Sequence, residues 1–347
     1  RQHGFGERRV QRTQVGIGLE PAPYYCRGVA RFNQGDTEGA IEDYNAALAC
    51  DPKCATAYDN RGNSHFKQGN FQLAIQDFTS ALTLAPNLHN THSKRASSYC
   101  AQNQFFEALF DCMQATLLNP HHRGWQENSH FVCHKLKEQE RNSGEQGKSE
   151  KKYMKLGIEC RREGRFQDAI VYFSCAIKLN PNVAGYYNLR ALSYKNLEQF
   201  DKAIDDYDRA IQIDADNPRF LSNRGSAHHM AQHFDQAITD LTRAIDLDAG
   251  LDRAWFHRGN VHLEMGDLGN AQTDFEMATT LAPDNAEYQE RYNEVQRLIA
   301  AQQQNTNEEE EEKKQPSVVT PQSLFSSNSS SSSRASQTPP NGPKGQR

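Results

Sequence analysis

The sequence predicts an all-α protein in which pairs of helices stack one after another as a solenoid in two sub-arrays, followed by a disordered C-terminal tail. Three observations carry this prediction. They are a period of 34 residues, small residues at fixed places within each period, and a change of composition after about residue 300. The 347 residues are enough for one extended array or for two ordinary domains.

The most visible marker of the period is an arginine, which leucine replaces in one unit: Arg27, Arg61, Arg95, Leu156, Arg190, Arg224 and Arg258. Each unit then has an alanine 13 residues after this marker and a second alanine seven residues further on. A proline closes five of the seven units. A pattern that returns this often indicates one supersecondary unit copied along the chain.

This pattern resembles the tetratricopeptide repeat family, whose 34-residue unit is a pair of helices. The resemblance covers residues 21–120 and 150–285 and implies a right-handed superhelix that binds protein partners. Four glycines fall at the turn between the two helices of a unit, where a left-handed conformation favours glycine. They are Gly35, Gly69, Gly164 and Gly266.

The period breaks once, where the frame slips by seven residues between the third and fourth units. Residues 123–139 keep an apolar stripe of Trp125, Val132 and Leu136, which predicts one helix that closes the first three repeats. The polar, glycine-containing stretch that follows predicts a hinge.

The expected organisation therefore has five segments: a disordered segment over 1–20, sub-array 1 over 21–140, a hinge over 141–149, sub-array 2 over 150–300 and a disordered tail over 301–347. A capping helix over 286–300 is expected to close sub-array 2. The tail is rich in Gln, Ser and Pro and cannot bury a core. Because the sequence starts without Met, we interpret it as a fragment or a processed product and leave open a further domain before Arg1.

The six units that have the arginine also have an aspartate sixteen residues later, and the seventh unit has lost both, with Leu156 and Tyr172 in their place. This joint loss predicts ion pairs within each repeat: Arg27–Asp43, Arg61–Asp77, Arg95–Asp111, Arg190–Asp206, Arg224–Asp240 and Arg258–Asp274. We interpret the pairs as structural, and a ligand-binding role is the alternative.

The resemblance implies that a partner peptide binds on the concave face lined by the first helix of each repeat. The basic residues assigned to that face are Lys67, Lys94, Lys151, Lys155, Arg161, Arg162, Lys195, Arg219 and Arg253. Its acidic residues are only Asp59 and Glu264, although the formal net charge of the chain is −5. With Asn188, Asn223 and Asn260, the second sub-array then predicts a groove for an acidic or C-terminal peptide. The alternative is that these charges serve solubility.

Two other functions stay open. Co-chaperones of this family bind acidic chaperone tails through a carboxylate clamp, to which Asn223 and Arg253 conform. Asn188 and Leu192 depart from the clamp pattern and His257 matches it imperfectly, so only a non-standard clamp is conceivable. The chain is alternatively a regulatory segment of a larger enzyme. Nucleic acid is not expected as a partner, because no aromatic stacking platform accompanies the basic residues.

No catalytic motif or phosphate-binding loop is present, so we predict neither an enzyme nor a cofactor. His121, His122, His130, Cys133 and His134 cluster by sequence, but their spacing fits no zinc finger and no metal is expected. The eight cysteines are expected to be reduced thiols. Without an apolar run of 18 residues we expect no transmembrane helix and no membrane insertion. The expected location is cytoplasmic, with a nuclear location left open. Two candidate phosphorylation sites, Thr320 and Thr338, each precede a proline.

Overall fold

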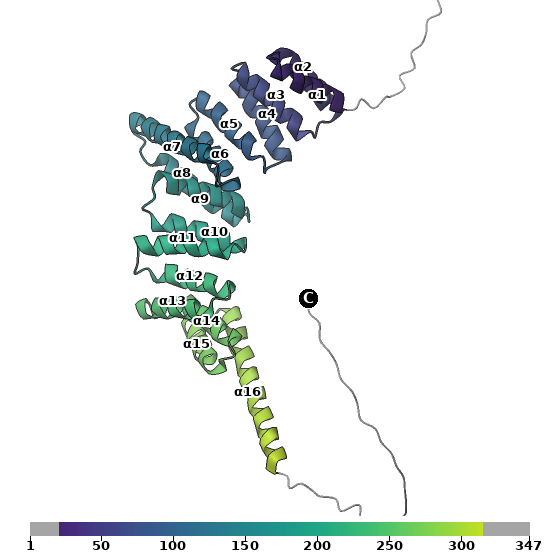
Figure 1. The fold of residues 1–347 in the computed structure, drawn as a ribbon. Helices are drawn as coiled ribbons and strands as arrows, with labels where there is room; N and C mark the ends of the chain where they lie inside the picture. The colour runs from purple at the N-terminus through teal and green to yellow at the C-terminus, as the bar shows by residue number, and fades with distance from the viewer. Residues whose placement is uncertain (1–20, 315–347) are drawn as a thin grey trace, which may run out of the picture. The chain divides into compact units, whose positions relative to one another are not determined.

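The computed structural model describes residues 21–314, with side chains from 22 to 308. This part of the chain contains sixteen α-helices and no strand (Figure 1). It divides into two compact units, the first ending at Val295 and the second beginning at Gln296. The N-terminal segment over 1–20 lies outside the described residues, as does most of the C-terminal segment over 301–347. The candidate sites Thr320 and Thr338 lie outside them as well.

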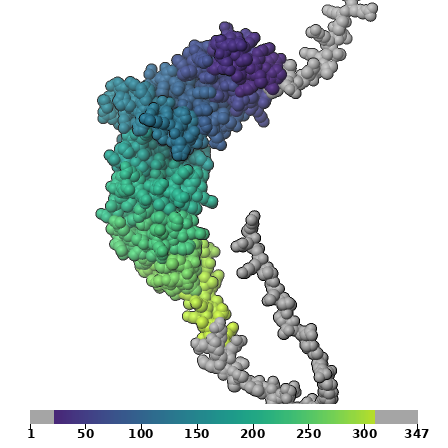
Figure 2. Space-filling view, viewed as in Figure 1, coloured from purple at the N-terminus to yellow at the C-terminus, as the bar shows by residue number. Residues whose placement is uncertain are grey.

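Fourteen of these helices form seven pairs, one pair for each repeat: α1 (Pro21–Asn33) with α2 (Thr37–Cys50), α3 (Ala55–Lys67) with α4 (Phe71–Leu84), α5 (His89–Ala101) with α6 (Phe105–Leu118), α8 (Lys148–Arg162) with α9 (Phe166–Leu179), α10 (Ala184–Asn196) with α11 (Phe200–Ile213), α12 (Pro218–Met230) with α13 (Phe234–Leu247), and α14 (Asp252–Glu264) with α15 (Leu268–Leu281). The other two are α7 (Arg123–Ser143) and α16 (Ala286–Lys314). The helices of a pair pack on each other and successive pairs of a sub-array stack in chain order, as the colour sequence of Figure 2 shows. The predicted helix-pair solenoid is confirmed.

Small residues let the two helices of a repeat approach closely. Gly157 on α8 faces the fully buried ring of Phe173 on α9. A Cβ atom at Gly157 would lie 2.6 Å from Cε1 of Phe173, a distance that no side chain can accept without a shift. This contact explains why the marker residue of each of the seven repeats is followed by glycine or alanine.

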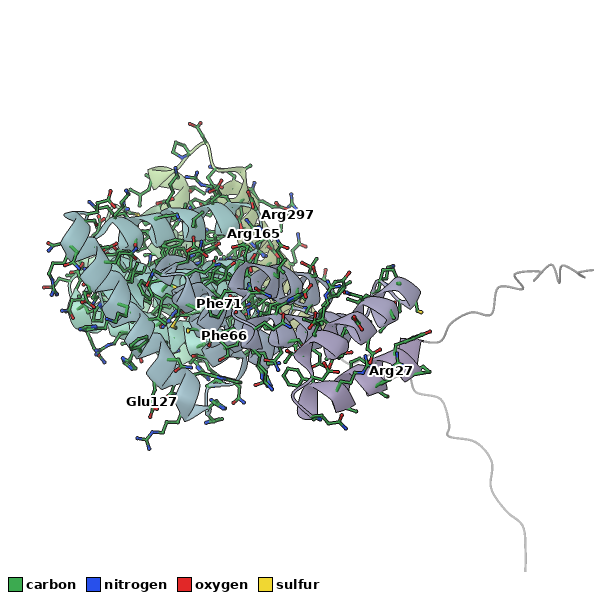
Figure 3. The ribbon with its side chains drawn as sticks, turned by 90° about the horizontal axis from the view of Figure 1, so that it is seen from above. Arg27, Phe66, Phe71, Glu127, Arg165 and Arg297 are labelled. Atoms are coloured by element: carbon green, nitrogen blue, oxygen red, sulfur yellow. The ribbon has the colours of Figure 1, made fainter. Side chains whose placement is uncertain are left out.

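The turn within each pair passes through one residue with a positive φ angle. The four predicted turn glycines adopt it, and Asn103, Glu198 and Gln232 adopt it in the other three repeats. Next to one of these turns, Phe66 of α3 and Phe71 of α4 lie side by side, with ring centroids 5.4 Å apart (Figure 3). The turn therefore has the same geometry in every repeat, even where an ordinary side chain has to accept it.

The break in the period is filled by α7, which is longer than any helix of a pair. The connection to α8 is short, because α7 ends at Ser143 and α8 begins at Lys148. The Glu140 carboxylate accepts hydrogen bonds from the backbone N–H groups of Gly147 (3.0 Å) and Ser149 (2.6 Å). A carboxylate at a helix N-terminus satisfies free N–H groups and meets the positive end of the helix dipole.

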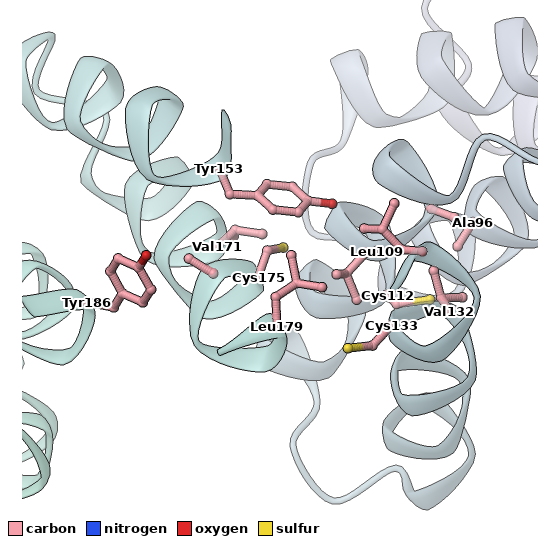
Figure 4. Close-up of a cluster of buried hydrophobic side chains, with 13 residues drawn as sticks. Ala96, Leu109, Cys112, Val132, Cys133, Tyr153, Val171, Cys175, Leu179 and Tyr186 are labelled. Carbon is pink, nitrogen blue, oxygen red and sulfur yellow. The ribbon is translucent and has the colours of Figure 1, made fainter. Parts of the chain in front are cut away.

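One buried cluster spans this connection (Figure 4). It joins Leu109 of α6 and Val132 of α7 from sub-array 1 to Tyr153 of α8 and Val171 of α9 from sub-array 2. Helix α6 packs directly against α9, and the Cys133 thiol of α7 donates to the Lys178 carbonyl at 3.4 Å. Residues 141–149 thus turn the chain where a hinge was expected, but the two sub-arrays share a core there. A bending motion at this place stays a prediction.

The capping helix extends further than expected. Its first part packs on the last repeat through Tyr288 and Val295, which are both buried. Instead of ending near residue 300, α16 continues to Lys314. The expectation of a disordered tail is therefore wrong for residues 301–308, which continue the helix because Ala and Gln favour it and the next proline comes only at Pro316. In the second unit the described side chains are exposed, apart from the half-buried Ile299.

The cysteines provide a test of the packing. All eight are free thiols, of which Cys26 is exposed and Cys112 and Cys175 are buried. Burial raises the pKa of Cys112 and of Cys175, so both stay protonated and unreactive. We expect a thiol reagent followed by mass spectrometry to label Cys26 in the native protein but Cys112 and Cys175 only after unfolding in urea. Labelling of Cys175 without denaturant would contradict this core, and Cys26→Ser identifies the fast site.

Candidate functional site

Each of the six Arg–Asp pairs forms within its own repeat, between the first and the second helix. The shortest distances between nitrogen and oxygen run from 2.5 Å for Arg27–Asp43 to 2.8 Å for Arg258–Asp274. In most pairs the guanidinium donates through Nε and Nη2 to the two carboxylate oxygens, as in Arg190–Asp206 at 2.7 and 2.6 Å. All six aspartates are buried. This bidentate, largely buried geometry holds the two helices together.

The same arginines also bond to the repeat before them. In five repeats Nη1 donates to a polar side chain sixteen residues earlier, on the second helix of the preceding repeat. The acceptors are Asn45, Thr79, Ser174, Asp208 and Thr242. Arg27 belongs to the first repeat described, and its side chain is 57% exposed. The arginine therefore links neighbouring repeats as well as the helices of one repeat.

The predicted groove residues all lie on first helices of sub-array 2. Helix α8 provides Lys151, Lys155, Arg161 and Arg162, α10 provides Asn188 and Lys195, α12 provides Arg219 and Asn223, and α14 provides Arg253 and Asn260. Among the described residues, no carboxylate lies within 4 Å of the charged groups of these seven cations. Their charges are therefore not neutralised by the repeats themselves.

The two acidic residues of this face are engaged elsewhere. Asp59 pairs with Lys94 at 2.7 Å, and its other oxygen accepts from the Thr91 hydroxyl at 2.8 Å. Glu264 lies 3.0 Å from Nε2 of His229. Lys67, which was also assigned to the face, has its ammonium 3.6 Å from the centroid of the Phe32 ring. Of the nine cations assigned to this face, Lys94 alone has a carboxylate partner among the described residues.

Three of the predicted residues meet at one cavity of about 350 Å³ between α12 and α14. We call it the cationic cavity, and its lining residues are Arg219, Ser222, Asn223, Leu251, Asp252 and Arg253. The Asp252 carboxylate accepts a hydrogen bond from the Tyr288 hydroxyl of α16 at 2.9 Å. The Asn223 amide is held by a 2.9 Å hydrogen bond that it donates to Asn188.

A half-buried histidine, His257, lies along the same face. Burial lowers the pKa of His257 to about 3, and the positive charges near it at Lys195, His229 and Arg253 act in the same direction. His257 is therefore neutral at physiological pH. Burial, together with Arg253, also lowers the pKa of Lys195, whose ammonium donates to the Ser226 hydroxyl at 3.2 Å. The sequence pattern suggested neither Ser222 nor Ser226, because a single serine has no diagnostic spacing.

A second cavity of about 360 Å³ lies in sub-array 1 between the first helices α3 and α5 and the start of α7. We call it the aromatic cavity, and its lining residues are Thr56, Asp59, Asn87, Leu88, His89, Asn90, Thr91, Ser93, Lys94 and Trp125. Sequence reasoning treated Trp125 only as part of an apolar stripe. The available signal was its place in the 34-residue frame, which continues through the start of α7.

No group of three or more His, Cys, Asp or Glu side chains in residues 21–314 is arranged to hold a metal ion, and this includes the histidines around α7. None of the helices in that range combines the length and the apolar character needed to cross a bilayer.

Repeat models match the chain in several places. One described as TPR repeat matches residues 28–69 and 193–232, and two described as tetratricopeptide repeat match residues 55–88 and 252–285. With the stacked helix pairs, these matches define a helical repeat scaffold of the kind that serves in protein–protein interaction. The chain is a tetratricopeptide repeat protein with about seven repeats. The comparison with curated proteins found no match.

Many solved structures are similar to parts of the chain. A tetratricopeptide repeat protein from Parabacteroides merdae is 17% identical over 80% of this chain and 98% of its own, with a TM-score of 0.36. The TPR2AB domain of yeast Sti1, solved as a pHSP90 complex, is 17% identical over 75% and 98%, with a TM-score of 0.32. The second TPR domain of human RPAP3, solved with the HSP70 peptide SGPTIEEVD, is 26% identical over 33% and 98%, with a TM-score of 0.31.

Proposed function

We propose that the chain is an interaction scaffold that binds an acidic peptide along the first helices of sub-array 2, with a carboxylate of the peptide in the cationic cavity. The observation that carries this proposal is the cavity itself. Two guanidinium groups, of Arg219 and Arg253, line it without a carboxylate in ion-pair contact with either of them among the described residues.

The chemistry of the cavity suits a carboxylate. An arginine presents two parallel N–H groups that match the two oxygens of a carboxylate. Asn223 adds an amide whose orientation is fixed by Asn188, and Ser222 adds a buried hydroxyl. The lining is mostly polar and partly enclosed. A charged group of the ligand therefore displaces the water molecules that would otherwise solvate the two arginines.

The remaining cations extend the site toward the N-terminal end of sub-array 2. Lys151, Lys155 and Arg162 are exposed on α8. They can attract further acidic residues of the same peptide from a distance, which raises the association rate more than the affinity. Because exposed lysines can equally serve solubility, the proposal rests on the cavity and not on these residues.

The first test uses labelled SGPTIEEVD as an acidic probe and measures fluorescence anisotropy. We expect Arg219→Glu and Arg253→Glu each to weaken binding about 30-fold or more, because losing one charged partner costs roughly 2 kcal/mol or more. Arg209→Glu is the matched control, since Arg209 is exposed on α11 and bonds only to Gln212. Equal affinity for all three variants would overturn the proposal, as would binding that is unaffected by salt.

The same probe tests the co-chaperone alternative. A clamp recognises the free C-terminal carboxylate, so amidating the C-terminus of the probe would abolish binding. If the cationic cavity accepts a side-chain carboxylate, the amidated probe keeps most of its affinity through its two glutamates. Asn223 and Arg253 conform to the clamp pattern, but the apolar Leu192 stands at a position where a clamp has a polar residue. We therefore expect amidation to have the smaller effect.

A further inference from the structure

A lysine without a counter-charge lies close to the cationic cavity. Lys195 of α10 is half-buried, and its ammonium donates to the Ser226 hydroxyl of α12 at 3.2 Å. Among the described residues this is its single hydrogen bond, so two of its three N–H donors are unused. In the same part of the chain no carboxylate lies within 4 Å of the ammonium.

The surroundings of this ammonium favour an anion. Burial lowers the pKa of Lys195, and the positive charge of Arg253 acts in the same direction. The neighbouring His257 is neutral at physiological pH and supplies no negative charge. A half-buried cation beside a second cation has lost part of its hydration without compensation. A carboxylate from outside the chain would provide the missing counter-charge.

Helix α12 sets the distance between this ammonium and the cationic cavity. Ser226, which accepts from Lys195, comes four residues after Ser222, which lines the cavity. Residues four apart lie on the same face of a helix, about 6 Å from each other. Lys195 itself is not a lining residue of the cavity. A ligand on this face therefore meets two separate positive positions, about one helical turn apart.

This distance corresponds to a particular spacing of acidic residues in a peptide. In an extended chain each residue advances about 3.3 Å, and successive side chains point to opposite faces. Residues i and i+2 therefore present their side chains to the same surface, about 6.6 Å apart. Two adjacent acidic residues cannot both face the protein in this way, because the second one points to solvent.

We propose that sub-array 2 recognises two carboxylates of one peptide that are separated by a single residue. The first carboxylate lies in the cationic cavity, and the second accepts from the Lys195 ammonium. This inference rests on the acidic ligand proposed above and adds the spacing of its charges. The partner is thus recognised by an acid–X–acid motif, and a long acidic run is not required.

Three labelled peptides with blocked termini test the spacing by fluorescence anisotropy. They are SGEAESG with alternate acids, SGEEASG with adjacent acids and SGEAQSG with one acid. The first two carry the same charge, so long-range attraction is the same for both. We expect the alternate peptide to bind about tenfold more tightly than the adjacent one, because one charge-assisted hydrogen bond contributes a factor of this order. The adjacent peptide should bind within about twofold of the peptide with one acid.

A variant of the lysine assigns the second carboxylate. Lys195→Gln keeps a donor for Ser226 and removes the charge, so the tenfold preference should fall to about twofold or less. Lys202→Gln is the matched control, because Lys202 is exposed on α11 and bonds to Gln199. The control should keep the full preference, and circular dichroism checks that both variants are folded. An unchanged preference in folded Lys195→Gln would overturn the proposal.

Arg219→Glu separates this inference from the function on which it rests. If the variant weakens binding of all three peptides while the alternate and adjacent peptides bind the native chain equally, the spacing is wrong and the acidic ligand stands. If it weakens none of them, the acidic ligand itself is wrong and the spacing falls with it. The expected result is weaker binding of all three peptides together with the tenfold preference in the native chain.

Discussion

Replacing Asp111 by alanine is expected to lower the free energy of unfolding by about 3–5 kcal/mol, the largest effect of any single ion-pair substitution in the chain. The Asp111 side chain is 1% exposed. It accepts from Nε and Nη2 of Arg95 at 2.7 and 2.8 Å and lies 2.8 Å from Nδ1 of His92. Its removal leaves a largely buried guanidinium without a counter-charge and Nδ1 of a buried imidazole without its partner, while Nε2 of His92 keeps its contact with the Pro86 carbonyl.

Urea denaturation followed by circular dichroism measures this loss. The matched control is Asp43→Ala, because the partner Arg27 is mostly exposed and water can solvate its charge once the aspartate is gone. We expect a distinctly smaller loss for the control. A double-mutant cycle with Arg95→Ala should show strong coupling, and additive single losses would contradict an ion pair that acts as one unit.

Replacing Tyr153 by alanine is expected to cost about 3–5 kcal/mol and to separate the unfolding of the two sub-arrays. Tyr153 lies on α8 and is fully buried. Its ring stacks on Phe106 of α6 at a centroid distance of 4.1 Å, and its hydroxyl donates to the Phe106 carbonyl at 2.5 Å. This one side chain therefore provides both an apolar contact and a hydrogen bond across the break in the period.

Calorimetry distinguishes the two parts of the effect. Tyr153→Phe keeps the stack and loses one hydrogen bond, so about 1 kcal/mol and a single transition are expected. Tyr44→Ala removes an equally buried ring inside the first repeat and tests whether any large cavity splits the transition. If Tyr153→Ala unfolds in one step with an unchanged midpoint, this side chain does not couple the two sub-arrays and the prediction is wrong.

The Arg–Asp geometry was predictable because one repeat lacks both residues. Because Leu156 and Tyr172 replace both partners in the same repeat, the pairing of arginine with aspartate could be inferred from the sequence alone. The second bond of each arginine, to the residue sixteen positions earlier, was not predictable in the same way. Asn45, Thr79 and Ser174 share no residue type, and only the stacking of repeats brings them to the guanidinium.

The candidate site shows the same limit. Sequence spacing placed Arg219, Asn223 and Arg253 on one face, and the structure adds that they line one cavity. Sequence spacing could not show that Lys94 is paired with Asp59 or that Lys67 lies over Phe32, because those contacts depend on side-chain directions in neighbouring repeats. The extent of α16 was misjudged for another reason, since polar composition was given more weight than the helix propensity of the same residues.

The two-sided bonding of the arginines has a consequence for how such a chain can change in length. In the described repeats, each acceptor sixteen residues before an arginine is a polar side chain, although its type differs from repeat to repeat. Duplication or loss of a whole 34-residue repeat within a sub-array would therefore keep this one bond at the new junction. The fourth repeat is the exception. With Leu156 in place of arginine and Glu140 committed to the start of α8, it fits only where it stands and fixes the boundary between the two sub-arrays.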